Sequence, residues 1–147
     1  GLKITLKNPY QFFTKAEMII KCKDPVFLKT NIINTMSCSH PDQGRYMKET
    51  APLHCGTCLP CVIRRAAIER AYGIDNSAYR DKDFKLGKAR NELKSYKIGL
   101  LDFKDSLSKT SFRIQNSGPI RSNIRDYEDI YKRGMQELTS LLDKYNG

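Results

Sequence analysis

Apolar residues recur at intervals of three and four positions along most of this 147-residue chain, the spacing that buries one face of an α-helix. A capping box of Thr14 and Glu17 predicts a first helix that runs through Ile20. Asp24 before Pro25 predicts the start of a second helix. The apolar positions of this second helix are Val26, Phe27, Leu28, Ile32 and Ile33. Two short helices are therefore expected before residue 34.

Longer helices are predicted in the rest of the chain. The run from Val62 to Tyr72 should form a helix that Gly73 ends, because glycine adopts the left-handed conformation at a helix C-terminus. An amphipathic helix of about six turns follows, with apolar positions at Leu86, Ala89, Leu93, Tyr96, Leu100, Phe103 and Leu107. Residues 108–121 contain Ser-Gly-Pro and predict a loop. A last helix, capped by Ser122 or Asn123, has its stripe at Ile124, Tyr127, Tyr131, Leu138, Leu141 or Leu142, and Tyr145.

The first eight residues have a different period. Apolar and polar side chains alternate at Leu2, Ile4 and Leu6, which is the pattern of a short strand. No partner strand is predicted in the rest of the sequence. Because one strand is not stable alone, its sheet is expected to lie in sequence outside these 147 residues. The first residue is glycine rather than methionine, which also suggests a fragment.

The most closely spaced candidate metal ligands lie in a cysteine-rich segment. Cys55, Cys58 and Cys61 are spaced C-x2-C-x2-C, and Cys38 precedes them across a polar loop. Four thiolates in such a pattern are typical of a tetrahedral metal site, and zinc is the usual ion. Gly56 allows the backbone to bend so that amides point at a sulfur. The pattern predicts one zinc ion bound by the four cysteines.

An iron-sulfur cluster and histidine ligands are the alternatives to a four-cysteine zinc site. An iron-sulfur cluster competes, because ferredoxins also begin with C-x2-C-x2-C. Ferredoxins continue with x3-C-P, whereas Cys61 is followed by V-I-R-R-A, so zinc is favoured. His40 and His54 could each replace one cysteine, although a histidine beside a full cysteine set is more often a hydrogen-bond donor behind the ligands. The fifth cysteine, Cys22, is interpreted as a core residue of an apolar helical segment.

Three basic residues are candidates for contacts to anions. Lys15 falls in the first turn of the first predicted helix, where a positive charge is unfavourable unless an anion is nearby. A solvated lysine is the alternative interpretation. Arg64 and Arg65 follow the last cysteine, and their simplest role is to offset the net negative charge of four thiolates around zinc.

Composition narrows the cellular setting and the partners. Four of five cysteines fit a metal site better than disulfides, which places the protein in a reducing cytoplasm. No apolar run is long enough for a membrane span, so no membrane partner is expected. The net charge of +10 is spread along the chain, and there is no tryptophan. Nucleic acid is therefore expected to bind only non-specifically.

Three motifs together resemble a known enzyme family. They are T-K-A-E-M-I at 14–19, N-T-M-S-C at 34–38 and C-G-T-C-L-P-C-V-I-R at 55–64. In this order and spacing they resemble the C-terminal part of the 7-cyano-7-deazaguanine synthases, ATP-dependent enzymes of the queuosine pathway. The resemblance covers about residues 8–75. It implies an α/β ATP-pyrophosphatase-type enzyme that adenylates a carboxylate and converts it through an amide to a nitrile.

The resemblance also implies roles for individual residues. Lys15 and Arg64 become candidate contacts to nucleotide or substrate. The zinc is implied to be structural, since four cysteines fill the tetrahedron and leave no position for water. Its ligands are implied to be Cys38, Cys55, Cys58 and Cys61.

Two features depart from the family pattern. The loop between Cys38 and Cys55 is longer than in the biosynthetic enzymes, and the residues after Ile74 have no counterpart there. Both features are more similar to the synthase-like protein of the Qat anti-phage defence system. The S-G-G-x-D-S loop that holds the ATP pyrophosphate does not occur in the sequence. The chain alone is therefore expected to be inactive.

The sequence thus predicts a mainly α protein with a small helical four-cysteine zinc lobe and an amphipathic helical hairpin. The lobe is assigned to residues 1–75 and the helical extension to 76–147. The hairpin helices are expected to pack on each other or to cover the zinc lobe. Expected partners are an N-terminal ATP-binding domain, a deazaguanine-type small molecule or a protein modified with one, and a second copy in a homodimer. The alternative is a stand-alone zinc-binding interaction domain for nucleic acid or protein.

Overall fold

The computed structural model describes residues 3–47, 53–120 and 122–145. Within these ranges the protein is mainly helical and contains no strand, only an isolated parallel bridge between His54 and Tyr79. The strand prediction for residues 1–8 is therefore wrong for residues 3–8, which are irregular; residues 1 and 2 lie outside the described part. Alternation alone does not make a strand, because no neighbouring segment supplies the hydrogen bonds.

Helix α1 (Lys15–Ile20) begins where the capping box predicted it. The backbone amide of Glu17 donates to Thr14 Oγ1 over 3.2 Å, and the amide of Thr14 donates to Glu17 Oε2 over 2.9 Å. These two bonds satisfy amides that the helix itself leaves unpaired. The inward face of α1 is small, consisting of Ala16 and Ile19.

Helix α2 (Pro25–Asn31) also begins as predicted, with Asp24 Oδ1 accepting the amide of Phe27 over 2.9 Å. However, none of its own residues is buried, and Val26 and Phe27 are 76% and 65% exposed. Of the five predicted apolar positions, Ile32 packs fully inward from the 3₁₀ turn η1 (Ile32–Asn34), whereas Ile33 is exposed. The sequence pattern located the helix but not its buried face.

Cys22 lies in the turn after α1 rather than within a helix. It is half-buried, and its Sγ donates to the carbonyl of Asp24 over 3.4 Å. Its interpretation as a core residue of a helical segment is therefore wrong. Helix α1 ends two residues before it, because the chain must turn to start α2 at Pro25.

Helix α3 (Leu59–Tyr72) is the central element. It ends as predicted at Gly73, whose φ of 80° is left-handed. One side contributes Val62 and Ala66 to the larger of two hydrophobic clusters, and the other contributes Ala67 and Ile68 to the smaller cluster with α1 and Ile32. Because both sides are buried, α3 joins the two halves of the molecule.

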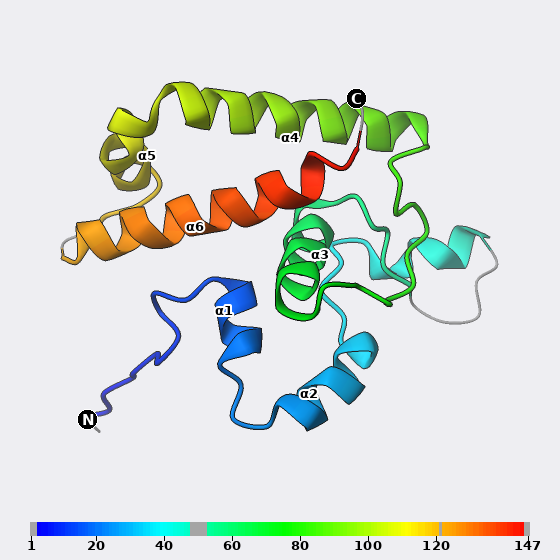
Figure 1. Cartoon of the computed structure of the whole chain (residues 1–147), viewed down its shortest axis with the longest axis horizontal. Helices are drawn as coiled ribbons and strands as arrows, with labels where there is room; N and C mark the ends of the chain where they lie inside the picture. Colours follow the sequence, from blue (N-terminus) through cyan, green and yellow to red (C-terminus); the bar gives the residue numbers. More distant parts are fainter. Residues whose placement is uncertain (1–2, 48–52, 121, 146–147) are drawn as a thin grey trace.

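Two long helices, α4 (Gly87–Asp105) and α6 (Ile124–Leu142), run side by side in opposite directions across one side of the molecule (Figure 1). The larger cluster comprises Val62, Ala66, Phe84, Ala89, Leu93, Leu100, Leu141 and Leu142. The hairpin predicted for residues 76–147 thus forms, and it also packs on α3. Leu86 and Leu107, at the two ends of the predicted stripe, are exposed.

The predicted loop at 108–121 is largely helical instead. A 3₁₀ turn, η3 (Leu107–Lys109), leads into α5 (Thr110–Asn116), and only the Ser-Gly-Pro end stays irregular. Thr110 and Ile114 are buried, and α5 packs against α6. This tertiary contact stabilises a helix too short to persist alone. Residue 121 lies outside the described part.

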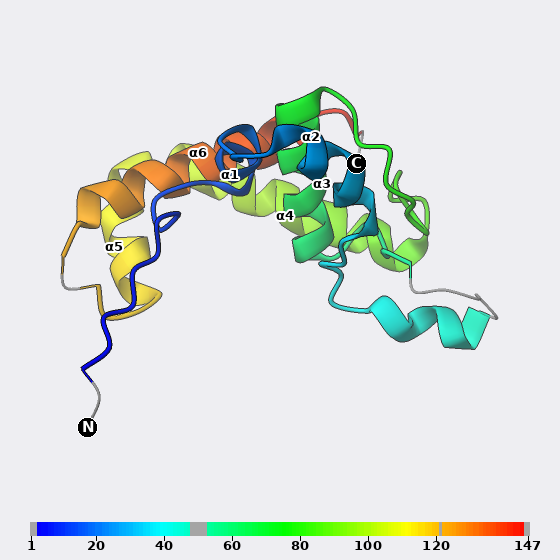
Figure 2. The ribbon, with the colours of Figure 1, turned by 90° about the horizontal axis from the view of Figure 1, so that it is seen from below.

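The start of α6 and the loop before the cysteine motif complete the fold. Asn123 is the N-cap of α6, with a left-handed φ of 59° and no capping bond from its side chain. Between the first ligand segment and residue 53, a 3₁₀ turn, η2 (Pro41–Met47), projects from the side of the molecule, in cyan in Figure 2. No helix among the described residues combines the length and apolar character needed to cross a membrane.

Candidate metal site

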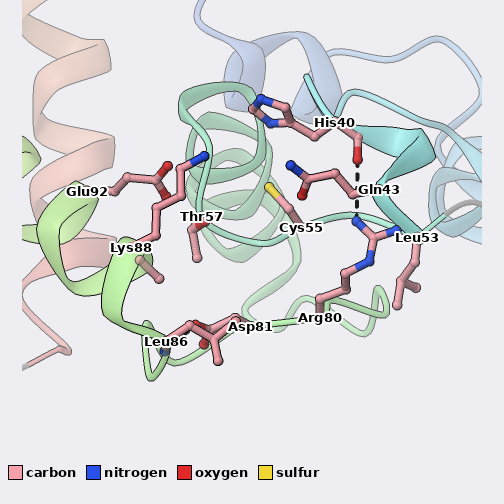
Figure 3. Close-up of a pocket in the computed structure, with 11 residues that line it drawn as sticks. His40, Gln43, Leu53, Cys55, Thr57, Arg80, Asp81, Leu86, Lys88 and Glu92 are labelled. Atoms are coloured by element: carbon pink, nitrogen blue, oxygen red, sulfur yellow. Dashed lines mark hydrogen bonds between the residues drawn. The ribbon is translucent and has the colours of Figure 1, made fainter. Parts of the chain in front are cut away.

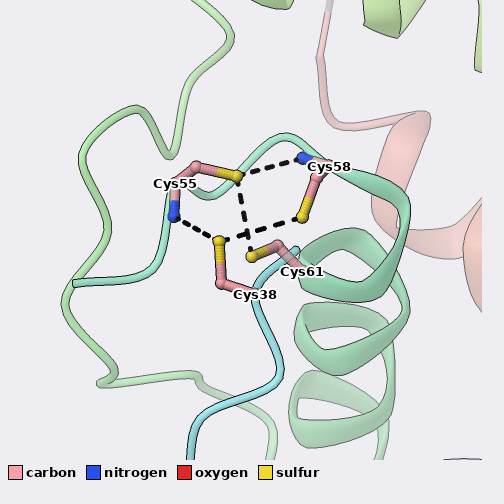
Figure 4. Close-up of side chains that lie close together, drawn as sticks. All are labelled: Cys38, Cys55, Cys58 and Cys61. Atoms are coloured by element: carbon pink, nitrogen blue, oxygen red, sulfur yellow. Dashed lines mark hydrogen bonds between the residues drawn. The ribbon is translucent and has the colours of Figure 1, made fainter. Parts of the chain in front are cut away.

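The four predicted ligand sulfurs converge on one point (Figure 4). The Sγ atoms of Cys38 and Cys58 are 4.0 Å apart, those of Cys55 and Cys61 are 3.8 Å apart, and all four lie within 4.8 Å of one another. Four sulfurs at 2.3 Å from a central ion define a tetrahedron with edges of about 3.8 Å. The cluster therefore fits a single metal ion.

Local structure places three ligands at the start of α3. Cys58 is the N-cap of the helix, Cys61 lies in its first turn, and Cys55 lies in the bend just before it. Leu59-Pro60 opens the helix, and proline is well suited to the first turn because it has no amide to satisfy there. Cys38 arrives from the segment after η1 and closes the site from the other side.

Backbone amides donate to the sulfurs. Cys38 Sγ accepts from the amides of His40 and Cys55 at 3.2 and 3.3 Å, and Cys55 Sγ accepts from Cys58 at 3.3 Å. The amide of Ser39 reaches Cys58 Sγ at 3.5 Å. Hydrogen bonds to the charged form of a group favour that form. This set of donors therefore supports thiolates, which are the form that binds metal.

The pKa values of Cys38, Cys55 and Cys61 depend on their neighbours in the cluster. The hydrogen bond with Cys61 holds the pKa of Cys55 far below its usual value, and the same bond raises the pKa of Cys61. Burial raises the pKa of Cys38, against the effect of the amides that donate to it. Four such thiols cannot all ionise without a cation between them, so the cluster favours a bound divalent ion.

Gly56 is required by the bend between the first two clustered ligands. Its φ is +91°, and a β-carbon at this position would lie 2.5 Å from the carbonyl oxygen of Asp81. The Gly56 amide also donates toward Cys61, which lowers the pKa of that thiol against the larger opposing effects. The predicted use of glycine to turn amides toward sulfur is confirmed.

A segment that sequence reasoning missed lies against this bend. The amides of Arg80 and Asp81 donate to the carbonyls of His54 and Cys55 at 2.9 and 3.1 Å, beside the bridge between His54 and Tyr79. Both carboxylate oxygens of Asp81 accept backbone amides just before α4, at 2.9 Å each. The contacts with His54 and Cys55 join residues more than twenty positions apart, so no local motif predicts them.

The two arginines after the last cysteine hold the two ligand segments. Arg64 is 5% exposed and donates to Thr35 Oγ1 at 2.6 Å, to Ser77 Oγ at 3.3 Å and to the carbonyl of Ile32. It thus anchors the segment that leads to Cys38. Its two terminal nitrogens are engaged by the protein, whereas its buried Nε has no hydrogen-bond partner among the described residues. A contact of Arg64 with nucleotide or substrate stays a prediction.

Arg65 anchors the other segment and is fully buried. It donates to the carbonyl of Gly56 at 2.8 Å and to the Tyr145 hydroxyl. Its guanidinium lies 5.2–5.6 Å from the ring centroids of Tyr79, Phe84 and Tyr145. Aromatic faces attract a cation, so this cage compensates a buried charge that has no carboxylate partner among the described residues.

Neither histidine joins the ligand set, since only the four cysteines cluster among the described residues. His54 is buried, and its Nε2 lies 3.1 Å from the carbonyl of Thr35, which can only accept, so Nε2 carries the proton. Burial, with the charge of Arg64, lowers its pKa and keeps the ring neutral. His54 therefore supports the site from behind, and the exposed His40 contributes its backbone amide.

Lys15, the remaining candidate, is exposed at the first position of α1. None of the hydrogen bonds or ion pairs among the described residues involves its side chain. Its proposed contact with an anion therefore stays a prediction.

Comparison with known proteins gave no match: no family model, curated protein or solved structure is significantly similar to this chain. The resemblance to the deazaguanine synthases therefore depends on the three sequence motifs alone. The geometry supports the metal-binding part of that resemblance, because the C-G-T-C-L-P-C run folds into a single-ion site with the N-T-M-S-C cysteine.

Proposed function

We propose that this chain is the zinc-binding C-terminal region of an ATP-dependent ligase of the 7-cyano-7-deazaguanine synthase type. The observation that carries the proposal is the cluster of four sulfurs of the motif residues, all within 4.8 Å of one another. Thiolate ligands with tetrahedral spacing favour zinc over the harder divalent ions. Zinc bound by Cys38, Cys55, Cys58 and Cys61 has no open position, so its role is to fix the fold.

The ATP-dependent chemistry is assigned to a partner domain. A phosphate-binding loop of the S-G-G-x-D-S or G-x-x-x-x-G-K-[ST] type is absent from the printed sequence. Without such a loop, Lys15 and Arg64 offer charge but little geometric selectivity for phosphates. The proposed enzyme adenylates the carboxylate of a deazaguanine with release of pyrophosphate, and ammonia then displaces AMP to form the amide. A second adenylation lets the amide oxygen leave with AMP to give the nitrile. A role in anti-phage defence is part of the proposal.

Metal analysis tests the first part of the proposal. The purified protein should be colourless and contain one zinc per chain, and Cys58→Ser should lose it. Cys22→Ser is the matched control, because Cys22 lies outside the cluster. Zinc contributes about 10–16 kcal/mol of apparent binding energy to folding in small domains, so chelation should unfold the segment from residue 34 to 73. Visible absorption from iron, or full zinc retention in Cys58→Ser, would contradict the assignment.

A nucleotide-binding measurement tests the second part. Calorimetric titration of the chain with ATP should show no micromolar affinity. The gene should encode an S-G-G-x-D-S loop upstream of Leu2, and the complete product should release pyrophosphate from ATP in the presence of 7-carboxy-7-deazaguanine. Tight ATP binding by the chain alone would overturn the assignment of the ATP chemistry to a partner domain. A complete product without that loop would favour a zinc-binding interaction domain instead.

A further inference from the structure

A pocket of about 430 Å³ lies beside the cysteine cluster, between the segment that follows Cys38 and the first turns of α4 (Figure 3). The segment after Cys38 contributes His40 and Gln43 to its lining. The bend before α3 contributes Cys55 and Thr57, and α4 contributes Lys88. Small-molecule sites in proteins have volumes of roughly 300–1,000 Å³. The pocket is therefore large enough for a small ligand. Of the residues that line it, only Cys55 belongs to the proposed zinc site.

Two charged groups in its wall serve the fold. Asp81 accepts two backbone amides, one with each carboxylate oxygen. Arg80 donates to the carbonyls of His40 and Pro41, at 3.3 and 3.4 Å. These contacts fix one side of the pocket and connect it to the loop behind Cys38.

Two other charged groups lack such contacts. Glu92 Oε2 is buried, yet it has no hydrogen-bond partner among the described residues. Lys88, one helical turn earlier, makes none of the ion pairs or hydrogen bonds found in the described part of the chain. Figure 3 shows both charged ends rising from α4 on the same side of the pocket. A buried carboxylate oxygen without a donor is costly, so Glu92 is suited to receive a donor from a ligand.

The rest of the α4 side is apolar. Leu86 and Ala89 line the pocket there, and Leu53 lies across the pocket beside Arg80 (Figure 3). A simple anion would face the carboxylate of Glu92, and a simple cation would face the ammonium of Lys88. A zwitterion pairs with both at once, and an apolar side chain on it can cover Leu86 and Ala89.

We propose that this pocket binds a free α-amino acid with an apolar side chain. The ammonium group of the ligand donates to Glu92, its carboxylate accepts from Lys88, and its side chain packs against Leu86 and Ala89. Lys88 lies at the surface on a flexible stem, so it can move aside to admit the ligand. This inference does not depend on the proposed ligase activity.

Calorimetric titration of the metal-loaded chain with L-leucine tests the proposal. Leucine should bind saturably with one site per chain. L-leucinol lacks the carboxylate and 4-methylpentanoate lacks the amine, so each should bind at least about tenfold more weakly, as expected for the loss of one charged hydrogen bond. Absence of saturable binding at millimolar leucine, or equal affinity for leucinol, would overturn the proposal.

Variants identify the residues. Glu92→Gln and Lys88→Met should each weaken leucine binding by about tenfold or more. Lys94→Met is the matched control, because Lys94 is exposed on the same helix but does not line the pocket, and it should leave the affinity unchanged. Metal content is measured for every variant. If Glu92→Gln loses its metal, Lys88→Met decides, and unchanged leucine affinity in that variant refutes the assignment.

Discussion

Replacing Gly56 with alanine should disrupt the metal site more than any other glycine substitution in the described part of the chain. The residue combines a left-handed φ of +91° with a close approach to another backbone segment. An added β-carbon would lie 2.5 Å from the carbonyl oxygen of Asp81 and 3.2 Å from the β-carbon of Tyr79. The first distance is too short for any real contact, and the atom it meets is backbone, so the segment at 79–81 must move.

The cost has two parts. Placing alanine in the left-handed region costs about 1–2 kcal/mol. Moving the segment at 79–81 strains two backbone hydrogen bonds, from Arg80 to His54 and from Asp81 to Cys55, each contributing about 0.5–1.5 kcal/mol. Gly56→Ala should therefore reduce the free energy of unfolding by about 2–5 kcal/mol. It should also speed zinc release to a chelator, because Cys55 sits on the displaced backbone.

Urea unfolding of the metal-loaded protein measures the first effect, and Gly73→Ala supplies the control. Gly73 has a similar φ of +80°, but nothing lies within 4 Å of its added β-carbon. Gly73→Ala should therefore cost only the backbone part, about 1–2 kcal/mol, and leave zinc release unchanged. Equal losses of stability for the two variants would refute the argument that the contact with Asp81 fixes the bend.

Three further substitutions test the packing, and a fourth, Glu137→Gln, tests the dependence of stability on pH. Gly134→Ala lies inside α6 with open space around the added carbon, so it should raise the free energy of unfolding by roughly 0.5–1 kcal/mol in urea titrations. Phe27→Ser should change the free energy of unfolding by less than about 0.5 kcal/mol, because the ring is 65% exposed. Leu93→Ala, in the core, should reduce the free energy of unfolding by about 2–5 kcal/mol. Burial raises the pKa of Glu137, so the folded state binds that proton more tightly than the unfolded state and stability falls as pH rises through the raised pKa. Glu137→Gln should flatten this decline in unfolding experiments between pH 4 and 8, and parallel curves would contradict it.

Features with short-range signals could be predicted from the sequence. The capping box at Thr14, the Asp24-Pro25 helix start and the Gly73 stop each involve residues within four positions, and the structure contains all three. The metal ligands belong to the same class, because three of them lie within seven residues. The fourth, Cys38, was predicted from ligand count rather than from contact, and its sulfur lies in the cluster.

Features that depend on packing could not be predicted in this way. The apolar pattern of α2 gave no sign that Val26 and Phe27 remain exposed, because burial depends on which elements lie nearby. The segment at 110–116 looked like a loop, yet contact with α6 makes it a helix. The alternation at residues 3–8 met no partner strand. In each case the deciding interaction lies outside the window of local sequence.

The arginine pair shows how the helical extension takes part in the metal site. Arg65 joins the bend at Gly56 to Tyr145, 80 positions along the chain from the arginine, while Arg64 joins the approach to Cys38 to Ser77. The bend itself is backed by the segment at 79–81. Tyr145, Ser77 and the segment at 79–81 all lie beyond Ile74, in the helical extension. The extension is thus a structural support of the cysteine cluster, since it supplies the hydrogen bonds and aromatic faces on which a buried guanidinium depends. We therefore expect the four cysteines and the two long helices to unfold as one cooperative unit, and a change at Tyr145 to reach the cysteine cluster through Arg65.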